Sequence, residues 1–423
     1  MNNRLSAAVT GILLLSFALA FPSCIKDKCS ETHAYTYFIP VYKTISEVRA
    51  NIKSNAPKDI EDPGKIYIKD NYIFLNDIDK GIHVIDNSNP SSPQNIAFID
   101  IPGNMDIAVK ENILYADQYA DLVAIDISNP TNVKLVKTIE GTFPERNWGN
   151  GFSIYRDDDV VVSWNKHDTV VVGDCERGSM LFESRSDVFF LSQAAGSNKS
   201  VSPIGTGGSM ARFTIVNDYL YTVDRHSLNC FSISDAANPD KKNQIWAGWD
   251  IETIYPFKNT LFMGSMGGMF IYDITNPTIP VKKSEFIHAR ACDPVVADDQ
   301  YAFVTLRAGT NCGPAENELL VIDVKNLEAP SLLKKYSMTG PAGLSRDIDL
   351  LFICDGKSGL KTYRATDVNN LQLLHTVSTI EPYDVIAMNE TALVVAADGL
   401  YQFDYSNPSA LNMLSKITVS KKP

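Results

Sequence analysis

The sequence lacks any long basic run, and it lacks the short motifs that mark the common catalytic centres. Its 50 Asp and Glu outnumber its 38 Lys and Arg, so the formal net charge is −12. Nucleic acids are bound through clustered positive charge, and we therefore do not expect nucleic acid as a partner. No G-x-S-x-G, H-E-x-x-H, G-x-x-x-x-G-K or D-x-D-x-D-G stretch occurs. The centres that these motifs build are not predicted, and we assign no catalytic residue.

Cysteine is also scarce, with seven residues in 423 and no C-x-x-C or Cys/His spacing of the kind that binds zinc, so no zinc site is predicted. Apolar residues, by contrast, make up 44% of the sequence, and aromatic residues make up 10%. This composition is typical of a globular chain with a large core and not of a disordered one.

The first 23 residues have the pattern of an export signal. Arg4 supplies a positive start, residues 7–21 are apolar but short for a membrane span, and Pro22-Ser23-Cys24 follows. This resembles a bacterial lipoprotein signal peptide, although the residues at 21 and 22 depart from the usual pattern. The resemblance implies that Cys24 is lipidated and anchors the exported protein to the cell envelope. The outer membrane is the membrane that we expect. An ordinary secreted protein is the alternative, and periplasmic or external facing stays open.

Export would place the remaining six cysteines in a compartment where disulfides persist. Cys292 and Cys312 lie close together in sequence, and we predict that they form a disulfide. Closing a loop of about twenty residues in this way contributes about 3 kcal/mol in the chain-entropy description. Two buried free thiols are the alternative.

A short apolar run that ends in Asp and a polar turn recurs along the chain. The clearest copies are IHVIDNSNP from residue 82, LVAIDISNP from 122, MFIYDITNP from 269 and LLVIDVKNL from 319. Weaker copies begin at 228, 360 and 400, and most spacings are near 40 residues. Each unit has room for four short strands, as at 106–109, 113–116, 122–125 and 133–139. A period near 40 with four antiparallel strands is typical of a propeller blade.

The turn has a structural explanation that needs no chemistry. The carboxylate of Asp126 can accept hydrogen bonds from backbone N–H groups that have left the sheet. Pro130 cannot donate to a sheet and directs the chain out of the third strand. Ser232 and Arg364 stand where two of the repeats would have this Asp, so those turns need another cap.

The repeats resemble the LVIVD-repeat β-propellers of bacterial and archaeal cell-surface proteins. The residues that carry the likeness are 82–86, 122–126, 269–273 and 319–323, with the Ser/Thr-Asn-Pro turns that follow most of them. The resemblance covers about residues 64–419 and implies an all-β fold. We predict seven four-stranded antiparallel blades, with six or eight as alternatives. The family carries no assigned reaction.

The remaining segments complete the expected organisation. Residues 24–63 form a tether and lead-in, in which 35–42 would suit an outer strand of a blade, and residues 420–423 form a tail. An insertion at about 141–206 is predicted to be a long hairpin that turns at 164–168. A smaller insertion at 307–318 lengthens a loop of the fifth blade. Long loops on a rigid scaffold often carry function.

Charged residues recur at the loop positions that would surround one mouth of the propeller channel. The candidates are Asp106, Glu252, Asp293 and Asp384 at the starts of first strands, Asp117, Asp224, Asp355 and Asp398 at the ends of second strands, and His226, His288 and Arg307 nearby. A ring of carboxylates would suit a calcium ion or a polar ligand. The alternative is that each carboxylate caps loop N–H groups within its own blade. His83, which alternates with apolar residues on a strand, is interpreted as structural.

We therefore expect a lipid-anchored binding or scaffold module for an envelope protein or an extracellular ligand. Beyond a possible calcium ion we expect no cofactor. An envelope hydrolase or lyase with its site at the channel mouth is the alternative, and a structural subunit of an outer-membrane complex is a third.

Overall fold

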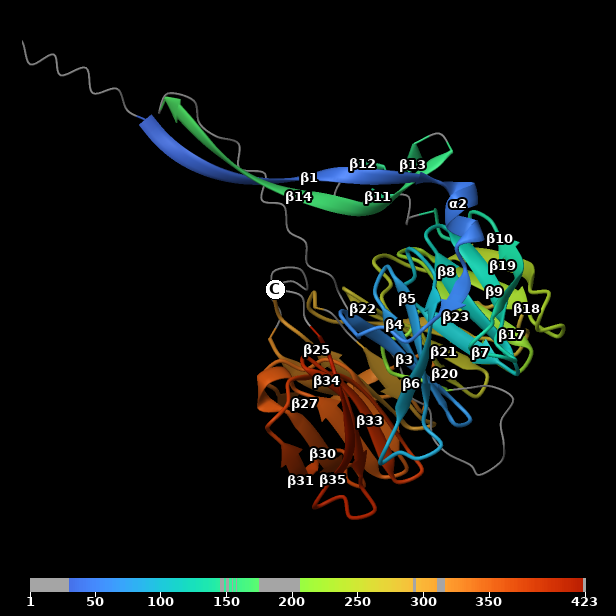
Figure 1. Ribbon diagram of the computed structural model, residues 1–423. Coiled ribbons are helices and arrows are strands. Elements are labelled where there is room, and N and C mark those ends of the chain that lie inside the picture. The colour runs from blue at the N-terminus through green and yellow to red at the C-terminus, as the bar shows by residue number, and fades with distance from the viewer. Residues whose placement is uncertain are drawn as a thin grey trace, which may run out of the picture. The chain divides into compact units, whose positions relative to one another are not determined.

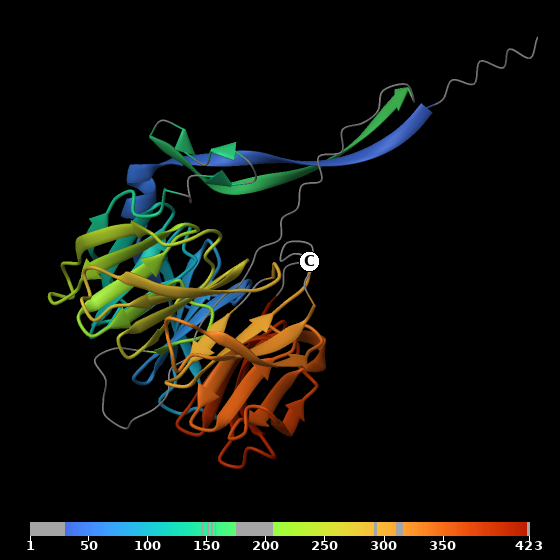
Figure 2. The same cartoon turned by 180° about the vertical axis from the view of Figure 1, so that it is seen from behind.

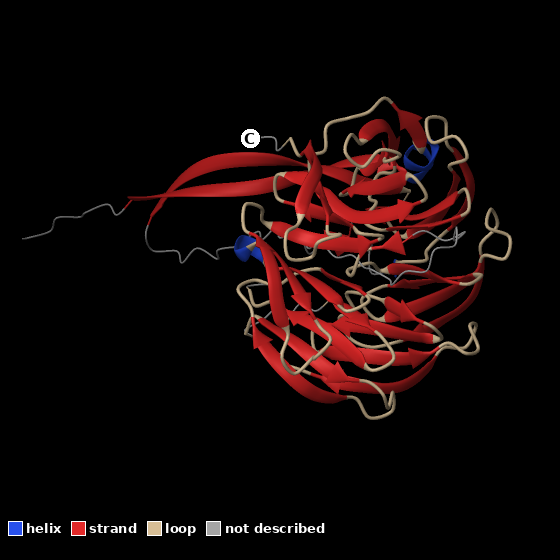
Figure 3. Cartoon of the chain, turned by 90° about the horizontal axis from the view of Figure 1, so that it is seen from below, coloured by secondary structure: helices blue, strands red, loops and turns tan. Residues whose placement is uncertain are grey.

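The computed structural model describes residues 30–144, 148–149, 152–153, 155–156, 158–174, 206–291, 294–309 and 316–420. Within them, the only helices are α2 (Ile45–Ala50) and the 3₁₀ turn η2 (Gly356–Ser358), and Figure 3 shows strands almost everywhere else. Neither helix has the length and apolar character that crossing a membrane requires. The signal peptide, Cys24 and the Cys292–Cys312 pair lie outside the described residues.

Seven four-stranded antiparallel blades are present in the described residues (Figures 1 and 2), which confirms the predicted fold. Blade one is β3 (Pro63–Lys69), β4 (Tyr72–Asp77), β5 (Gly81–Asp86) and β6 (Gln94–Asp100), and blade two is β7 (Ile107–Lys110), β8 (Ile113–Gln118), β9 (Asp121–Asp126) and β10 (Lys134–Ile139). Blade three is β16 (Phe213–Val216), β17 (Tyr219–Val223), β18 (Ser227–Ser232) and β19 (Asp240–Trp246), and blade four is β20 (Tyr255–Phe257), β21 (Thr260–Ser265), β22 (Gly268–Asp273) and β23 (Val281–Ile287). Blade five is β24 (Val295–Ala297), β25 (Tyr301–Leu306), β26 (Glu318–Asp323) and β27 (Ser331–Ser337), and blade six is β28 (Leu344–Asp347), β29 (Leu350–Cys354), β30 (Leu360–Arg364) and β31 (Gln372–Val377). Blade seven is β32 (Pro382–Met388), β33 (Thr391–Ala396), β34 (Gly399–Asp404) and β35 (Asn412–Thr418).

Burial changes in a regular way across each blade. In blade two, β8 is buried along its whole length, whereas β10 is mostly exposed. The pairing of the third and fourth strands shifts register in every one of these blades, as between Leu135 and Lys137. An exposed edge strand is a template for pairing with another chain, and bulges and lysines are common protections against that. The fourth strands of blades two to seven are therefore protected edges in the described residues, and the fourth strand of blade one is covered by a further strand.

The ring is closed by packing between the last blade and the first. One apolar cluster combines Ile66 and Ile73 of blade one with Ile386 and Leu393 of blade seven. The lead-in also joins the two ends of the ring, because Ile60 forms a parallel bridge with Val419. An outer strand is added to blade one by β2 (Lys53–Asn55).

The Asp turns form as predicted. Asp126 Oδ1 accepts the N–H of Ser128 at 2.8 Å, and this bond lowers the pKa of the carboxyl group. Asn129, in the same turn, makes the same kind of bond, because its Oδ1 accepts the N–H of Thr131, two residues later, at 3.1 Å. The same first bond is made by Asp86, Asp273, Asp323 and Asp404. In the two blades without this Asp, Ser232 Oγ lies 3.2 Å from Ser234 Oγ, and Arg364 Nε lies 3.4 Å from Asp349 Oδ2.

A second compact unit, separate from the propeller, contains residues 30–41 and 163–174 of the described chain. It is a ribbon in which β1 (Ser30–Thr44) pairs with β14 (Asp159–Asp174) (Figure 1). The start of β14 belongs to the larger unit, where it pairs with β13 (Tyr155–Arg156). Tyr37 and His167 stack across the ribbon, with ring centroids 5.4 Å apart. The turn expected at 164–168 is wrong, because β14 continues through these residues, which contain neither Gly nor Pro. The expectation that 35–42 joins a blade is also wrong, since β14 is their partner.

Candidate functional site

The loops of interest lie at one end of the propeller, which we call the loop end. In an antiparallel blade, the connection into the first strand and the loop between the second and third strands emerge at the same end. Most of the described candidate residues belong to these two kinds of loop, whereas Asp117 lies near the end of β8 and Asp384 near the start of β32. Asp293 is outside the described residues.

The channel of the propeller is occupied by residues 206–212, which we call the channel segment. It begins with β15 (Thr206–Gly207), which pairs with the first strand of blade one. Ser209 Oγ accepts the N–H of Leu344 in blade six at 2.8 Å, and Ala211 O accepts the N–H of Ile254 before blade four at 2.8 Å. Ser209, Met210 and Ala211 are almost fully buried. The predicted common mouth is therefore filled by the chain itself.

A buried ion pair lies against the channel segment. Lys65 Nζ donates to Met210 O at 2.7 Å and lies 3.9 Å from Asp106 Oδ2. Desolvation lowers the pKa of Lys65 to about 7 and raises the pKa of Asp106 to about 6. Asp106 also accepts the N–H groups of Arg212 and Ile107. Asp106 thus anchors the channel segment, and Lys65 is a participant that sequence reasoning missed.

The buried carboxylates at the ends of the second strands cap loops. Asp117 Oδ1 accepts two backbone N–H groups, from Met105 and Asp106, both at 2.8 Å. Asp355 Oδ1 accepts those of Thr339 at 2.9 Å and Gly340 at 2.8 Å. In blade one, the carboxylate of Asp77 accepts the backbone N–H groups of Glu61 and Asp62. This geometry agrees with the alternative in which each carboxylate serves its own blade. Among the described residues, no three His, Cys, Asp or Glu side chains are grouped so as to hold a metal ion.

The remaining candidates are dispersed over the loop end. Asp224 Oδ1 accepts the N–H of Arg225 at 2.8 Å, and the buried Asp384 packs beside Gly343. Asp398, which is exposed, pairs with Lys416 at 2.6 Å. Arg307 lines a polar hollow of about 270 Å³ with residues of blades five, six and seven. Glu252 lies in the connection into blade four, where its N–H donates to Gly264 O at 2.9 Å.

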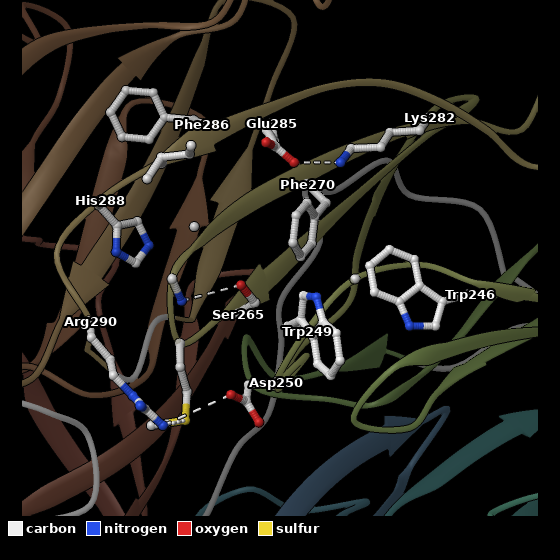
Figure 4. Close-up of a pocket in the computed structure, with 15 residues that line it drawn as sticks. Trp246, Trp249, Asp250, Ser265, Phe270, Lys282, Glu285, Phe286, His288 and Arg290 are labelled. Atoms are coloured by element: carbon white, nitrogen blue, oxygen red, sulfur yellow. Dashed lines mark hydrogen bonds and ion pairs between the residues drawn. The ribbon is translucent and has the colours of Figure 1, made fainter.

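One of the candidates, His288, lines a pocket between blades three and four (Figure 4), which we call the aromatic pocket, and a second, His226, packs against one of its tryptophans. It has a volume of about 390 Å³. The lining residues are Trp246, Gly248, Trp249, Asp250, Ser265, Met266, Gly267, Gly268, Phe270, Lys282, Glu285, Phe286, Ile287, His288 and Arg290. His226 packs edge-on against Trp249, with ring centroids 4.9 Å apart.

Two tryptophans dominate the exposed surface of the pocket. Trp246 is 59% exposed and Trp249 is 67% exposed. Their ring centroids are 5.7 Å apart and their planes are 79° apart, so the two indoles present differently oriented faces (Figure 4). Tryptophan is usually well buried, and exposed aromatic residues grouped in a hollow are typical of binding sites.

Backbone hydrogen bonds between successive loops hold the pocket in shape. Ala247 N donates to His226 O at 2.7 Å, Met266 N donates to Asp250 O at 3.1 Å, and His288 N donates to Gly267 O at 3.2 Å. These bonds link four successive loops of blades three and four. The pocket is therefore preorganised, which lowers the entropic cost of binding.

Gly248 brings Phe270 against the loop that carries Trp249. A Cβ atom at residue 248 would lie 2.4 Å from the Phe270 ring. Lys282 Nζ lies 4.7 Å from the centroid of the same ring. Phe270 is thus fixed by a close backbone contact and by a cation placed over it.

The charged groups of the pocket are paired with one another. Asp250 contacts Arg225 and lies 3.9 Å from Arg290, and Lys282 pairs with Glu285. Of the lining side chains, two are acidic and two are basic, so their formal charges cancel. The pocket offers hydrogen-bonding groups without a net formal charge of its own.

The aromatic residues of this site were missed in the sequence. The available signal was the stretch Trp246-Ala-Gly-Trp249, which places two of the four tryptophans of the chain at the end of an exposed edge strand. An exposed strand end does not need tryptophan for packing, so the pair was a sign of function.

Comparison with known proteins agrees with the repeat. The family described as LVIVD repeat matches residues 62–98 and 103–140, which correspond to blades one and two. No curated protein matches the chain.

Solved structures agree with the fold. A protein from Lactobacillus plantarum is 12% identical with a TM-score of 0.52, and covers 85% of this chain and 97% of its own. The periplasmic gluconolactonase PpgL of Pseudomonas aeruginosa is 9% identical with a TM-score of 0.53, over 88% of this chain and 97% of its own. The computationally designed Ika8 protein is 8% identical with a TM-score of 0.51, over 87% and 92%. At such identities the likeness concerns the fold alone. The protein is thus a seven-bladed β-propeller that carries LVIVD repeats.

Proposed function

We propose that this protein is a binding module of the bacterial cell envelope, lipid-anchored through Cys24, and that the aromatic pocket holds its ligand. The observation that carries the proposal is the presence of two exposed tryptophans in a preorganised pocket at the loop end. The propeller supplies a rigid frame, and the loops between blades three and four supply the recognition surface.

Leaving the two indoles exposed to water costs free energy. An aromatic side chain can bury 150–250 Å², and apolar burial contributes about 25 cal/mol per Å². Covering the exposed part of Trp246 or Trp249 would therefore contribute about 2–4 kcal/mol each. In the free protein the exposed parts of these two indoles contribute no packing energy. A ligand that covers them would explain why they are present.

Binding is favoured over catalysis by the position of the titratable groups. The residues with the most altered pKa values near the channel, Lys65 and Asp106, are covered by the channel segment. A substrate at the loop end would not reach them. An envelope hydrolase or lyase remains the competing proposal, and it would show turnover that a single substitution at the loop end removes.

The test is affinity capture from detergent-solubilised membranes with the full-length chain as bait. We expect one stoichiometric component to be retained by the unmodified protein and lost with Trp249→Ala. Met413→Ala is the matched control, because Met413 is 61% exposed on the fourth strand of blade seven, away from the pocket. Equal capture by Trp249→Ala and the control would refute the pocket as the binding site.

The anchor has its own test. Cys24→Ala should move the protein from the membrane fraction to the soluble fraction, because the acyl chains that hold it would be absent. Retention of Cys24→Ala in membranes would contradict lipid anchoring and would leave the pocket proposal standing.

A further inference from the structure

We infer that the ligand of the aromatic pocket is a neutral saccharide, an inference that rests on the proposed binding function and narrows it. It is based on three features of the pocket: the angle between the indoles, the pairing of its charges, and hydrogen-bonding groups beside the exposed ring of Trp249 (Figure 4).

The angle between the rings disfavours a flat aromatic ligand. A flat ring bound between two aromatic side chains is best held when their planes are parallel, whereas Trp246 and Trp249 lie 79° apart. A pyranose ring stacks its C–H face on a single indole. Successive sugars in an oligosaccharide turn about the glycosidic bond, so two faces at a steep angle can be covered by two neighbouring sugars.

The paired charges disfavour a charged ligand. Asp250 is held between Arg225 and Arg290, and Lys282 is paired with Glu285. A carboxylate or ammonium ligand would have to separate these pairs, and the net charge of −12 adds repulsion for acidic polysaccharides. The ligand is therefore expected to be uncharged.

The groups beside Trp249 suit hydroxyls. Asp250 follows Trp249 directly in the chain, and its carboxylate accepts hydrogen bonds, while the guanidinium of Arg290 donates them. A sugar hydroxyl does both, so adjacent hydroxyls at the rim of a stacked ring can bond to the two groups of the ion pair without breaking it. His288 Nδ1 lies 2.8 Å from Ala289 O, and in the tautomer that donates this bond Nε2 is a further acceptor.

The experiment uses the full-length chain in a detergent without a sugar headgroup, because a maltoside would compete for the site. Maltotriose, cellotriose, mannotriose and chitotriose are titrated separately, and binding is followed by calorimetry and by tryptophan fluorescence. We expect at least one trisaccharide to bind and to shield the indoles from acrylamide quenching. Trp249→Ala should weaken binding about tenfold or more, equal to about 1.4 kcal/mol, while Trp249→Phe retains most of it.

Two further variants distinguish specific recognition of the sugar from non-specific binding. Met413→Ala should bind the same sugar as tightly as the unmodified chain. Asp250→Asn, which keeps the side-chain shape and suits the positive φ of residue 250, should weaken sugar binding, because bonds to an ionised acceptor are the stronger ones. An unchanged affinity for Asp250→Asn would contradict the assigned hydroxyl contacts.

A proline-rich decapeptide is the competing probe, because extended proline helices also dock on aromatic grooves. If it binds through Trp249 and no trisaccharide does, the saccharide inference is wrong and the binding function stands. The same holds if no probe binds at about 10 mM while membrane capture still depends on Trp249. If capture is also independent of Trp249, both proposals fail.

Discussion

The buried pair Lys65 and Asp106 should give the stability of the propeller a distinctive pH dependence. Burial lowers the pKa of Lys65 from 10.5 to about 7, so between these values the unfolded chain binds more protons than the folded one. Folding stability then rises with pH in this window. Asp106 acts in the opposite sense, because burial raises its pKa from 3.8 to about 6. Between those values the folded chain binds more protons, and stability falls as pH rises.

The magnitude follows from the linkage relation. With a pKa of about 7 folded and 10.5 unfolded, Lys65 should contribute about 2 kcal/mol of added stability between about pH 7 and about pH 9. Lys65→Met has no amine and lacks this contribution. The measurement is urea unfolding at several pH values in this range, followed by tryptophan fluorescence, with the difference between the two free-energy curves as the readout.

A second variant tests the pairing itself. Lys65→Met leaves the carboxylate of Asp106 buried without a cation, which is strongly destabilising. Adding Asp106→Asn should recover part of that loss, since a neutral amide needs no cation and its one oxygen can still accept one of the two N–H groups, of Arg212 or Ile107, that the carboxylate accepts. Parallel pH curves for the unmodified chain and Lys65→Met would refute the reasoning, because they would mean that the Lys65 amine is not desolvated on folding.

Three further outcomes are expected. Gly248→Ala should keep the propeller folded but cost about 1–3 kcal/mol and change the tryptophan emission, since the new Cβ overlaps the Phe270 ring; an unaltered emission spectrum would contradict the contact. Millimolar calcium should leave the melting temperature unchanged, since the strand-end carboxylates described above already accept backbone N–H groups; a filled site at a hundred times its dissociation constant would add about 2.7 kcal/mol. Cys230 and Cys354 are buried and burial raises the pKa of both thiols, so site-resolved mass spectrometry should find them alkylated only after denaturation.

The fold could be predicted because each blade is specified locally. The signal is an apolar strand, an Asp that closes a turn and a proline that prevents the sheet from continuing, repeated about every 40 residues. Asp126 shows why this works: its partner is the N–H of Ser128, two residues away. An interaction of this range can be inferred from sequence, and the seven blades are the sum of such signals.

The channel segment could not be predicted, because its contacts are remote in sequence. Lys65 bonds to Met210, and Ser209 bonds to Leu344, across spans of well over a hundred residues. Its Gly- and Ser-rich sequence carries no periodicity that would indicate burial. Equivalent positions in the repeats also did not predict a shared binding site. Asp117 and Asp355 occupy equivalent positions, but each accepts hydrogen bonds from backbone N–H groups next to its own blade.

The candidate site was predicted in part. His226 and His288 were candidates because they have charged neighbours in loops. His288 lines the aromatic pocket, and His226 packs against its Trp249. The tryptophans beside them carry no titratable group and match no motif, so neither charge patterns nor motifs indicate them. Their orientation depends on hydrogen bonds among four loops that are separate in the sequence.

The pocket lies where one connecting loop differs from the equivalent loops of the other blades. A propeller of similar blades presents similar loops around its axis, and a filled channel removes the axis itself as a place for a ligand. Recognition must then come from a loop that differs from its equivalents. Residues 247–254 join blades three and four, while only residues 378–381 join blades six and seven. The connection at 247–254 carries Gly248, Trp249 and Asp250, and these residues create a binding surface that the repeat alone would not provide.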